Sequence, residues 1–257
     1  QRRLRASAAE PNRMKRHANA VAGRRSAAGE ASSFDVLDRL VVFSDKDASL
    51  AQSLAPKANV RVVHPGLSPQ LRLSREVDSS APVVLFTGAL ERVDNWRSII
   101  WFLEHCWRTV KAASPAARLV IAGAAPPPQL IAAARAAHDV QLTGYVDSLE
   151  PYYASATVII APILSGAGVK FKTGDAMLRG VPVVATSIGA EGIDAHHLLG
   201  AVVDDPTAFA KAVVSELVTT DEARTTAAEA WADSVYGTSA FQARIAEGYG
   251  ELLGNKP

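Results

Sequence analysis

Residues 165–172, a short stretch of glycines and lysines, have the types and spacing that suit binding of a phosphate. Gly166 and Gly168 let backbone N–H groups approach a ligand closely, and a helix expected just after them turns its unpaired N–H groups toward the same point. Lys170 and Lys172 fall at the start of that helix, where they add the positive charge that a diphosphate leaving group needs. The alternative, that both lysines are solvated surface residues, stays open.

A carboxylate, Asp175, follows three residues after Lys172 and therefore shares a helix face with it. In this position it can accept two hydroxyl hydrogen bonds from a ribose, as acidic residues do in other nucleotide sites. A simple ion pair with Lys172 or Arg179 is the other interpretation, and spacing alone does not decide between them.

The elements that must position these side chains follow from hydrophobic patterning. Short apolar runs alternate with amphipathic stretches from residue 40 onward, which predicts an α/β fold, a Rossmann-like parallel sheet flanked by helices. The expected strands are residues 40–44, 60–64, 83–87, 118–122, 140–142, 157–161, 182–185 and 201–203. The expected helices are 46–54, 96–113, 127–137, 149–154, 171–179 and 206–219, with two more at the end of the chain.

Three glycine-containing loops follow expected strands: Gly88, Gly123 and residues 165–168. Ligands of open parallel sheets bind beyond the carboxyl ends of the strands, so these loops are expected at the same edge. Each glycine taken singly is more typical of a turn, and their common location is what favours a binding site.

Composition excludes several classes of function. The 257 residues carry 27 basic and 26 acidic side chains, a net charge of +1, which disfavours nucleic acid as a partner. The single cysteine, Cys106, cannot form an internal disulfide, and no Cys/His cluster has the spacing of a metal site. No apolar run approaches the roughly 20 residues that span a bilayer, and no signal peptide is visible. A cytoplasmic protein, peripheral at most to the inner face of the membrane, is expected.

The order of motifs resembles the C-terminal domain of retaining glycosyltransferases of the GT-B fold, family 4 or glycosyl transferases group 1. The resemblance runs from about residue 38 to 253. Its most specific part is Gly-Ala-Gly-Val-Lys-Phe-Lys-Thr-Gly-Asp-Ala-Met from residue 166, followed by Pro-Val-Val-Ala-Thr at 182–186. Further matches are Phe-Thr-Gly at 86–88 with Asn95 downstream, Leu-Val-Ile-Ala-Gly at 119–123, Thr-Gly-Tyr-Val-Asp at 143–147 and Gly-Ala-Glu-Gly-Ile at 189–193.

This resemblance implies a metal-independent, hexosyltransferase-like enzyme that moves a sugar from a nucleotide-diphosphate sugar to an acceptor with retention. The acceptor, a glycan, lipid or small molecule, is not specified, and no cofactor is implied. The catalytic side chains would be Lys170, Lys172 and Asp175, with the ribose at Asp175 and the base beside Tyr145 and Val146. The implied substrate contacts are Gly88, Asn95, Tyr145, Val146, Ser165, Gly166, Ala167 and Gly168.

The sequence also departs from the family pattern. Many members carry an acidic residue at the position of Ala167, and Arg and Lys at the positions of Ala89 and Asp94. These departures keep a second hypothesis open, a non-catalytic nucleotide-sugar-binding or scaffolding module that acts with another chain. An NAD-dependent oxidoreductase would need Gly-x-Gly-x-x-Gly after its first strand, and that pattern is absent.

The expected domain organisation has three parts. Residues 1–32 form a basic arm or the remnant of a preceding helix, 33–73 a remnant of an acceptor domain with the interdomain crossover, and 74–257 the nucleotide-sugar-binding domain. In the family the N-terminal domain binds the acceptor, so that portion is expected to be truncated here. A separate or upstream acceptor domain is then an expected partner, and this chain alone is expected to transfer no sugar.

Overall fold

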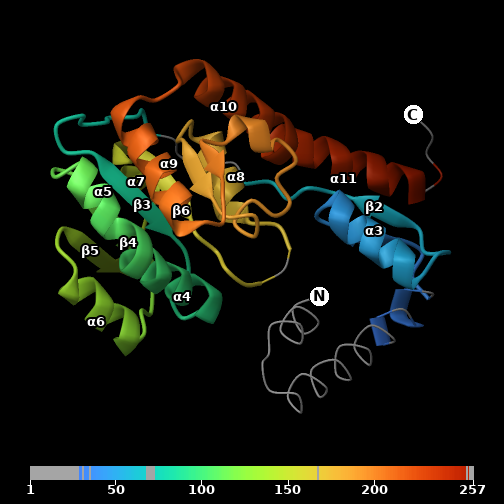
Figure 1. The fold of residues 1–257 in the computed structure, drawn as a ribbon. Coiled ribbons are helices and arrows are strands. Elements are labelled where there is room, and N and C mark those ends of the chain that lie inside the picture. The colour runs from blue at the N-terminus through green and yellow to red at the C-terminus, as the bar shows by residue number, and fades with distance from the viewer. Residues whose placement is uncertain are drawn as a thin grey trace, which may run out of the picture. The chain divides into compact units, whose positions relative to one another are not determined.

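The computed structural model describes residues 29–30, 32–34, 36–67, 73–166, 168–252 and 254. The chain divides into two units: unit 1 comprises Gln1–Pro65, Ser165–Val169 and Phe241–Pro257, and unit 2 comprises Gly66–Leu164 and Lys170–Ala240. The ribbon of both units is drawn in Figure 1. Most of the basic arm predicted at 1–32 lies outside the described residues.

Unit 2 is built on a six-stranded parallel sheet with the strand order β5-β4-β3-β6-β7-β8. Its strands are β3 (Val83–Thr87), β4 (Arg118–Ala122), β5 (Val140–Gly144), β6 (Val158–Ala161), β7 (Val183–Ala185) and β8 (Ala201–Val202). All six coincide with expected strands, with small differences at their ends. The predicted α/β fold with a Rossmann-like parallel sheet is therefore confirmed.

The central strand β3 shows why these residues form a doubly covered sheet. All five of its residues are buried, and they alternate between two hydrophobic cores. Val83 and Leu85 belong to one core, whereas Val84 and Phe86 belong to the other. Such continuous apolar runs are typical of parallel strands with helices on both faces.

Helices cover both faces of the sheet, as Figure 1 shows. One face carries α4 (Val93–Phe102), the π-helical turn η1 (Leu103–Trp107), α5 (Arg108–Ala113), α6 (Pro128–Ala136) and α9 (Pro206–Val218). The other carries α7 (Glu150–Ser155), α8 (Phe171–Leu178) and α10 (Glu222–Tyr236). The helix predicted at 96–113 is thus the continuous run α4-η1-α5, in which Cys106 is buried.

The strand order defines a topological switch point between β3 and β6. From β3 the chain moves through β4 to β5 on one side and then returns to β6 on the other side of β3. The connections that leave the carboxyl ends of β3 and β6 therefore diverge to opposite faces of the sheet. In open α/β sheets this topological switch point opens a crevice in which ligands bind.

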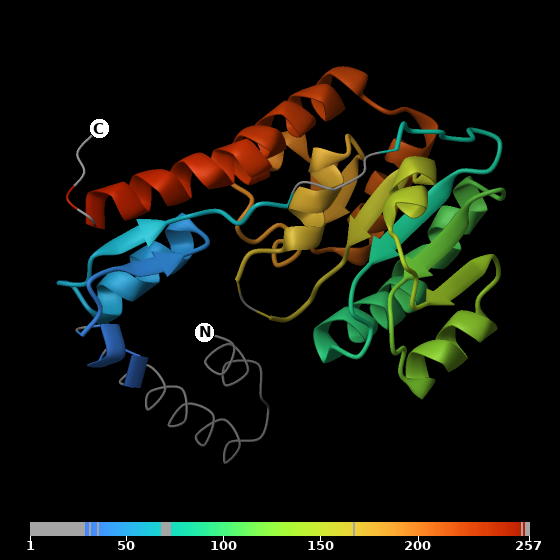
Figure 2. The same ribbon diagram turned by 180° about the vertical axis from the view of Figure 1, so that it is seen from behind.

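Unit 1 contains a two-stranded parallel pair, β1 (Leu40–Val42) and β2 (Val60–Val62), joined by α3 (Asp45–Leu54), and these elements can be followed in Figure 2. Ser44 caps α3 by accepting a hydrogen bond from the backbone N–H of Asp47. The last helix, α11 (Thr238–Leu252), contributes Glu247 to an ion pair with Arg61.

Among the described residues, no helix has the length and apolar character needed to cross a membrane.

Candidate functional site

The carboxyl end of β3 carries Gly88, and its conformation brings two backbone segments unusually close. A Cβ atom on Gly123, which follows β4, would lie 1.9 Å from the carbonyl oxygen of Gly88. Only glycine fits at that position, since real Cβ contacts are never so short. Gly88 itself has φ of +155°, and a Cβ there would lie 3.1 Å from both Lys172 Nζ and Asn95 Nδ2. The absence of side chains at Gly88 and Gly123 therefore permits this close packing at the carboxyl edge of the sheet.

Lys172, on the first turn of α8, lies against the same glycine. Its Nζ donates a hydrogen bond of 2.8 Å to Asn95 Oδ1 and lies 4.0 Å from the centroid of the Phe86 ring. Asn95 is fixed in turn, because its Nδ2 donates to the carbonyl of Ala89 at 2.8 Å. The structure therefore brings together three of the predicted site residues: Gly88, Asn95 and Lys172.

The charge of Lys172 is not neutralised by any partner in the part of the chain that the structure describes. No carboxylate there forms an ion pair with its ammonium, which has only an amide oxygen and an aromatic face as neighbours. Removal from water lowers the pKa of Lys172 to about 7, and repulsion from Lys170 and Arg92 adds to the effect. A half-buried ammonium of this kind is typical of a site that binds an anion.

Lys170 is placed differently, although it is only two residues away. It is the N-cap residue of α8, its side chain is 12% exposed, and its Nζ lies 3.4 Å from Glu191 Oε2. The backbone N–H of Lys170 also donates to the carbonyl of Glu191 at 3.0 Å. Lys170 is therefore not a solvated surface lysine, and its charge has a carboxylate partner.

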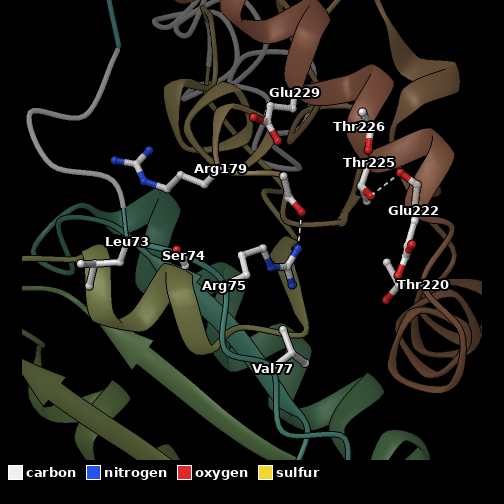
Figure 3. A pocket seen from close by; sticks show the side chains of 11 residues that line it. Leu73, Ser74, Arg75, Val77, Arg179, Thr220, Glu222, Thr225, Thr226 and Glu229 are labelled. Atoms are coloured by element: carbon white, nitrogen blue, oxygen red, sulfur yellow. Dashed lines mark hydrogen bonds between the residues drawn. The ribbon is translucent and has the colours of Figure 1, made fainter.

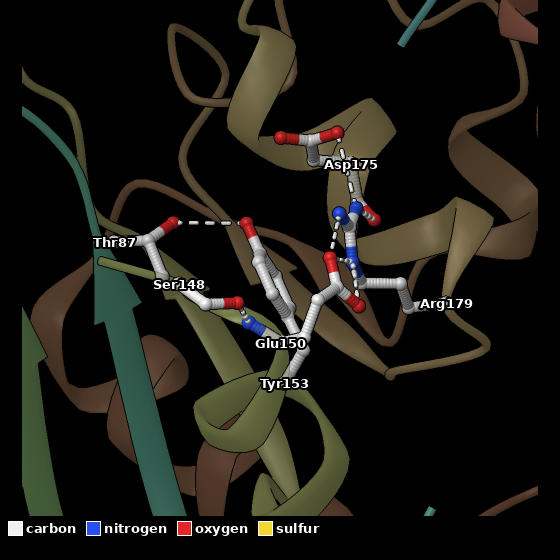
Figure 4. Close-up of polar contacts among 6 residues, drawn as sticks. All are labelled: Thr87, Ser148, Glu150, Tyr153, Asp175 and Arg179. Carbon is white, nitrogen blue, oxygen red and sulfur yellow. Dashed lines mark hydrogen bonds and ion pairs between the residues drawn. The ribbon is translucent and has the colours of Figure 1, made fainter. Parts of the chain in front are cut away.

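Asp175, in the middle of α8, takes part in a network that Figure 4 shows in full. Its Oδ1 accepts a hydrogen bond of 3.1 Å from Arg179, the C-cap residue of the helix. Arg179 Nε also bonds both carboxylate oxygens of Glu150, at 3.0 and 3.2 Å. Of the two ion pairs that the sequence left open for Asp175, the structure forms the one with Arg179.

Tyr153 extends this network to the sheet. The guanidinium carbon of Arg179 lies 4.3 Å from the centroid of the Tyr153 ring. The Tyr153 hydroxyl lies 3.2 Å from Thr87 Oγ1, at the carboxyl end of β3 (Figure 4). Burial is the largest cause that raises the pKa of the Tyr153 hydroxyl, so the group stays a neutral hydrogen-bonding partner.

The glycine loop, Ser165–Val169, belongs to unit 1. Gly166 and Gly168 have φ of +121° and +85°, values that residues with a side chain rarely adopt. Ser165 is exposed. Ala167, a predicted substrate contact, lies outside the described residues.

Tyr145 and Val146 follow β5, the edge strand of the sheet, and so they leave its carboxyl end. Tyr145 is 75% exposed, one of the most exposed large apolar side chains described, and Val146 is half-buried. No contact in the structure links them to Lys172 or Asp175, so their predicted role beside the base remains a prediction.

A separate cavity of about 520 Å³ lies near the amino ends of β6 and β7, and Figure 3 shows its lining. Arg75 marks this position, because it donates to the carbonyls of Ala156, just before β6, and Gly180, just before β7. The remaining lining residues include Leu73, Val77, Thr220, Glu222, Thr225 and Glu229. Apart from Arg179, this cavity shares no residue with the network around Asp175.

Sequence reasoning assigned no role to Phe86, Glu191 or Glu150. Phe86 has the pattern of an ordinary core residue in a buried strand, so nothing in the sequence shows that a lysine lies over its ring. Glu191 and Glu150 come from segments far from α8 in the sequence, and only folding brings them to Lys170 and Arg179. Within the described residues, no group of three His, Cys, Asp or Glu side chains is placed to hold a metal ion.

The fold is shared with solved GT-B glycosyltransferases. Sucrose-phosphate synthase from Thermosynechococcus elongatus matches with a TM-score of 0.70 and 18% identity, over 91% of this chain and 63% of that one. Anabaena HepE, solved in complex with UDP and glucose, matches with a TM-score of 0.66 and 15% identity, over 88% of this chain and 66% of that one. At such low identity these matches establish the fold, which is that of a GT-B glycosyltransferase.

The sequence defines the family more closely. The profile of the family described as glycosyl transferases group 1 matches residues 81–218, and the chain belongs to this family. An uncharacterized 44.6 kDa protein in the cps region of Klebsiella pneumoniae is 34% identical over 140 residues, which make up 51% of this chain and 36% of that protein. The chain thus spans about a third of the length of this relative.

Proposed function

We propose that unit 2 binds a nucleotide-diphosphate sugar and serves as the donor half of a retaining glycosyltransferase. The observation that carries the proposal is Lys172, a half-buried ammonium at the switch point of the sheet that has no carboxylate partner among the described residues. A ligand phosphate would supply the missing negative charge. The similar fold of Anabaena HepE, whose structure contains UDP and glucose, supports a uridine nucleotide as the first candidate.

The proposal gives each predicted site residue a role. Lys172 and the backbone at Gly88 would hold the diphosphate, with Asn95 fixing the lysine in place. The carboxylate of Asp175 would accept the ribose hydroxyls, and Tyr145 with Val146 would flank the base. Lys170 would add a second positive charge there, and the phosphate contacts predicted for Ser165, Gly166, Ala167 and Gly168 stay predictions.

The chemistry is a sugar transfer in which the bond between the anomeric carbon and the diphosphate oxygen breaks. A bond from an acceptor hydroxyl oxygen to the same carbon forms, and the hydroxyl proton passes to the leaving diphosphate. Negative charge grows on that diphosphate as the bond breaks, and Lys172 is placed to stabilise it in a site largely shielded from water. We propose that lysines and backbone N–H groups serve here in place of a metal ion and that no cofactor takes part.

The acceptor, a glycan, lipid or small molecule, would bind on a second Rossmann-like domain, since the GT-B fold has two such domains facing each other. A scaffolding role without catalysis is the alternative, and the alanine at position 167 favours it, because many relatives carry an acidic residue there. The two functions share the same nucleotide site and differ only in turnover.

Calorimetric titration with UDP, GDP, ADP and their glucose derivatives tests the proposal directly. We expect saturable binding of at least one nucleotide with a Kd in the micromolar to submillimolar range. If none of these compounds binds at millimolar concentration to protein that is folded by circular dichroism, the proposal is wrong.

A further inference from the structure

We propose that Arg179 is a positioning residue for the sugar-nucleotide site, holding Asp175 ionised and oriented so that one carboxylate oxygen stays available for ribose hydroxyls. This inference rests on the proposed function and adds residues outside the predicted site, Arg179 and Glu150. The network in Figure 4 carries it.

The two carboxylate oxygens of Asp175 have different surroundings. Arg179 Nη1 donates to Oδ1 at 3.1 Å and to the backbone carbonyl of Asp175 at 2.9 Å, which clamps that residue from one side. Among the described residues, no other side chain bonds the carboxylate, and the Asp175 side chain keeps 30% of its surface exposed. The second oxygen is therefore left for a ligand.

The guanidinium that clamps Asp175 is itself held by Glu150 and by the Tyr153 ring. Glu150 accepts two hydrogen bonds from Nε at 3.0 and 3.2 Å, and the Tyr153 ring lies beneath the group at 4.3 Å. The side chains of Arg179 and Glu150 are only 9% and 13% exposed. A planar guanidinium fixed by a two-oxygen pair has one orientation, so Asp175 does too.

Arg179 also affects the charge of Asp175. Burial raises the pKa of Asp175, and the charge and hydrogen bond of Arg179 oppose that rise. Without Arg179, Asp175 would face Glu150 across a site with little water, and like charges so placed favour protonation of one of them. A protonated Asp175 accepts fewer hydrogen bonds from a ribose. Arg179 thus controls both the direction and the charge of the acceptor group.

The experiment compares UDP with 2′-deoxy-UDP, or the matching pair of whichever nucleoside diphosphate binds most tightly. The ratio of their two affinities isolates the ribose contact, because phosphate and base are the same in both. We expect the parent protein to prefer the ribonucleotide by roughly tenfold, as for a hydrogen bond to a charged group. Asp175→Asn is the reference variant and is expected to reduce this preference to about twofold or less.

Arg179→Met is expected to lose the ribose preference as Asp175→Asn does, while binding of 2′-deoxy-UDP changes less than threefold. The lost preference should return in part as the pH is raised, because burial raises the pKa of Asp175 and a higher pH ionises its carboxyl group. Arg179→Lys keeps the charge without the two-oxygen geometry and is expected to restore part of the preference at pH 7. If Arg179→Met does not fold, Arg179→Lys and Glu150→Gln still give the answer, since each loosens the clamp without removing the cation.

The outcomes separate the two proposals. If the parent protein binds no nucleoside diphosphate, the proposed function fails. If the parent discriminates UDP from 2′-deoxy-UDP and the folded Arg179 and Glu150 variants discriminate equally well at every pH, the positioning role is overturned while the nucleotide site stands. A loss that is equal for both nucleotides would likewise assign Arg179 to the fold alone and overturn the inference.

Discussion

Two cations at opposite ends of α8 have contrasting surroundings. Lys172, on the first turn, has an amide oxygen and an aromatic ring for neighbours, and its pKa falls to about 7. Arg179, at the C-cap, is enclosed by the carboxylates of Glu150 and Asp175. Although burial opposes it, these partners raise the pKa of Arg179 above its ordinary value. Arg179 thus has two carboxylate partners, whereas Lys172 has none among the described residues.

The contrast suggests a division of work along one helix. Burying a charge costs free energy unless the charge is paired. An unpaired, half-buried ammonium therefore indicates a role in binding rather than in stability. A paired arginine instead ties α8 to α7 and the sheet. We therefore expect Arg179 to govern stability and, through Asp175, the preference for a ribose, and Lys172 to govern affinity for the diphosphate. Four measurements test that separation.

The largest expected effect concerns stability. Arg179→Met should lower the free energy of unfolding by about 3 to 5 kcal/mol, because it leaves two carboxylates facing each other in a poorly hydrated site. Lys172→Met should not lower it, and at or below pH 7 should raise it, since the substitution removes a charge that is shielded from water and has no counter-ion. Urea unfolding followed by circular dichroism measures both. Equal losses in the two variants would contradict the comparison.

The next effect concerns binding, where Lys172 is expected to matter more than Arg179. Lys172→Met should weaken binding of the nucleoside diphosphate roughly ten- to a hundredfold, the value of a charge-assisted hydrogen bond of about 1.5 to 3 kcal/mol. Lys211→Met, an exposed lysine of α9, is the matched control and should change affinity less than twofold. Calorimetry at fixed salt measures both. A Lys172→Met variant that binds like the parent would place the diphosphate elsewhere.

The pKa of Lys172 predicts a stability difference that depends on pH. In the unfolded chain lysine titrates near 10.4, whereas the folded value is about 7. Between these values the unfolded state binds more protons, so the contribution of Lys172 to the free energy of unfolding rises with pH, by up to about 1.4 kcal/mol per unit. Below about pH 7 both states are protonated and the contribution is constant.

Urea unfolding of the parent and of Lys172→Met at pH 6, 7, 8 and 9 isolates this contribution as the difference between the two proteins. We expect the parent to gain on the variant above pH 7. Saturating UDP-glucose, whose phosphates do not titrate in this range, should flatten the dependence by keeping Lys172 protonated. A difference that is flat from pH 6 to 9 without ligand would show that Lys172 is fully charged in the free protein.

The smallest expected effect comes from Asn95, which fixes Lys172 through a single hydrogen bond. Asn95→Ala removes the acceptor of Lys172 and the donor to Ala89 but leaves the ammonium in place. Affinity for the nucleoside diphosphate should fall about threefold to fivefold, as for a neutral hydrogen bond of about 1 kcal/mol. Loss as great as that of Lys172→Met would make Asn95 a direct ligand contact rather than a support.

The sequence by itself determined the parallel sheet, and it predicts the edge of the sheet at which a ligand would bind. Continuous apolar runs such as residues 83–87, Val-Val-Leu-Phe-Thr, identify buried parallel strands, because such strands have no polar face. Gly88 and Gly123 come directly after two of those strands, and at Gly123 the close approach of the Gly88 backbone excludes a Cβ atom. These signals are local, so they can be recognised in the sequence without knowing which residues come into contact in the fold.

Only the tertiary structure decided which partners surround the ionisable groups of α8. Lys170 and Lys172 look alike in the sequence, yet Glu191 reaches one and Phe86 with Asn95 surrounds the other. Asp175 had two candidate cations at helical spacing, and Glu150, a residue of a different helix, fixes the arginine that it pairs with. Electrostatic energies depend on distance and solvent exposure, and both are set by contacts between segments far apart in the chain.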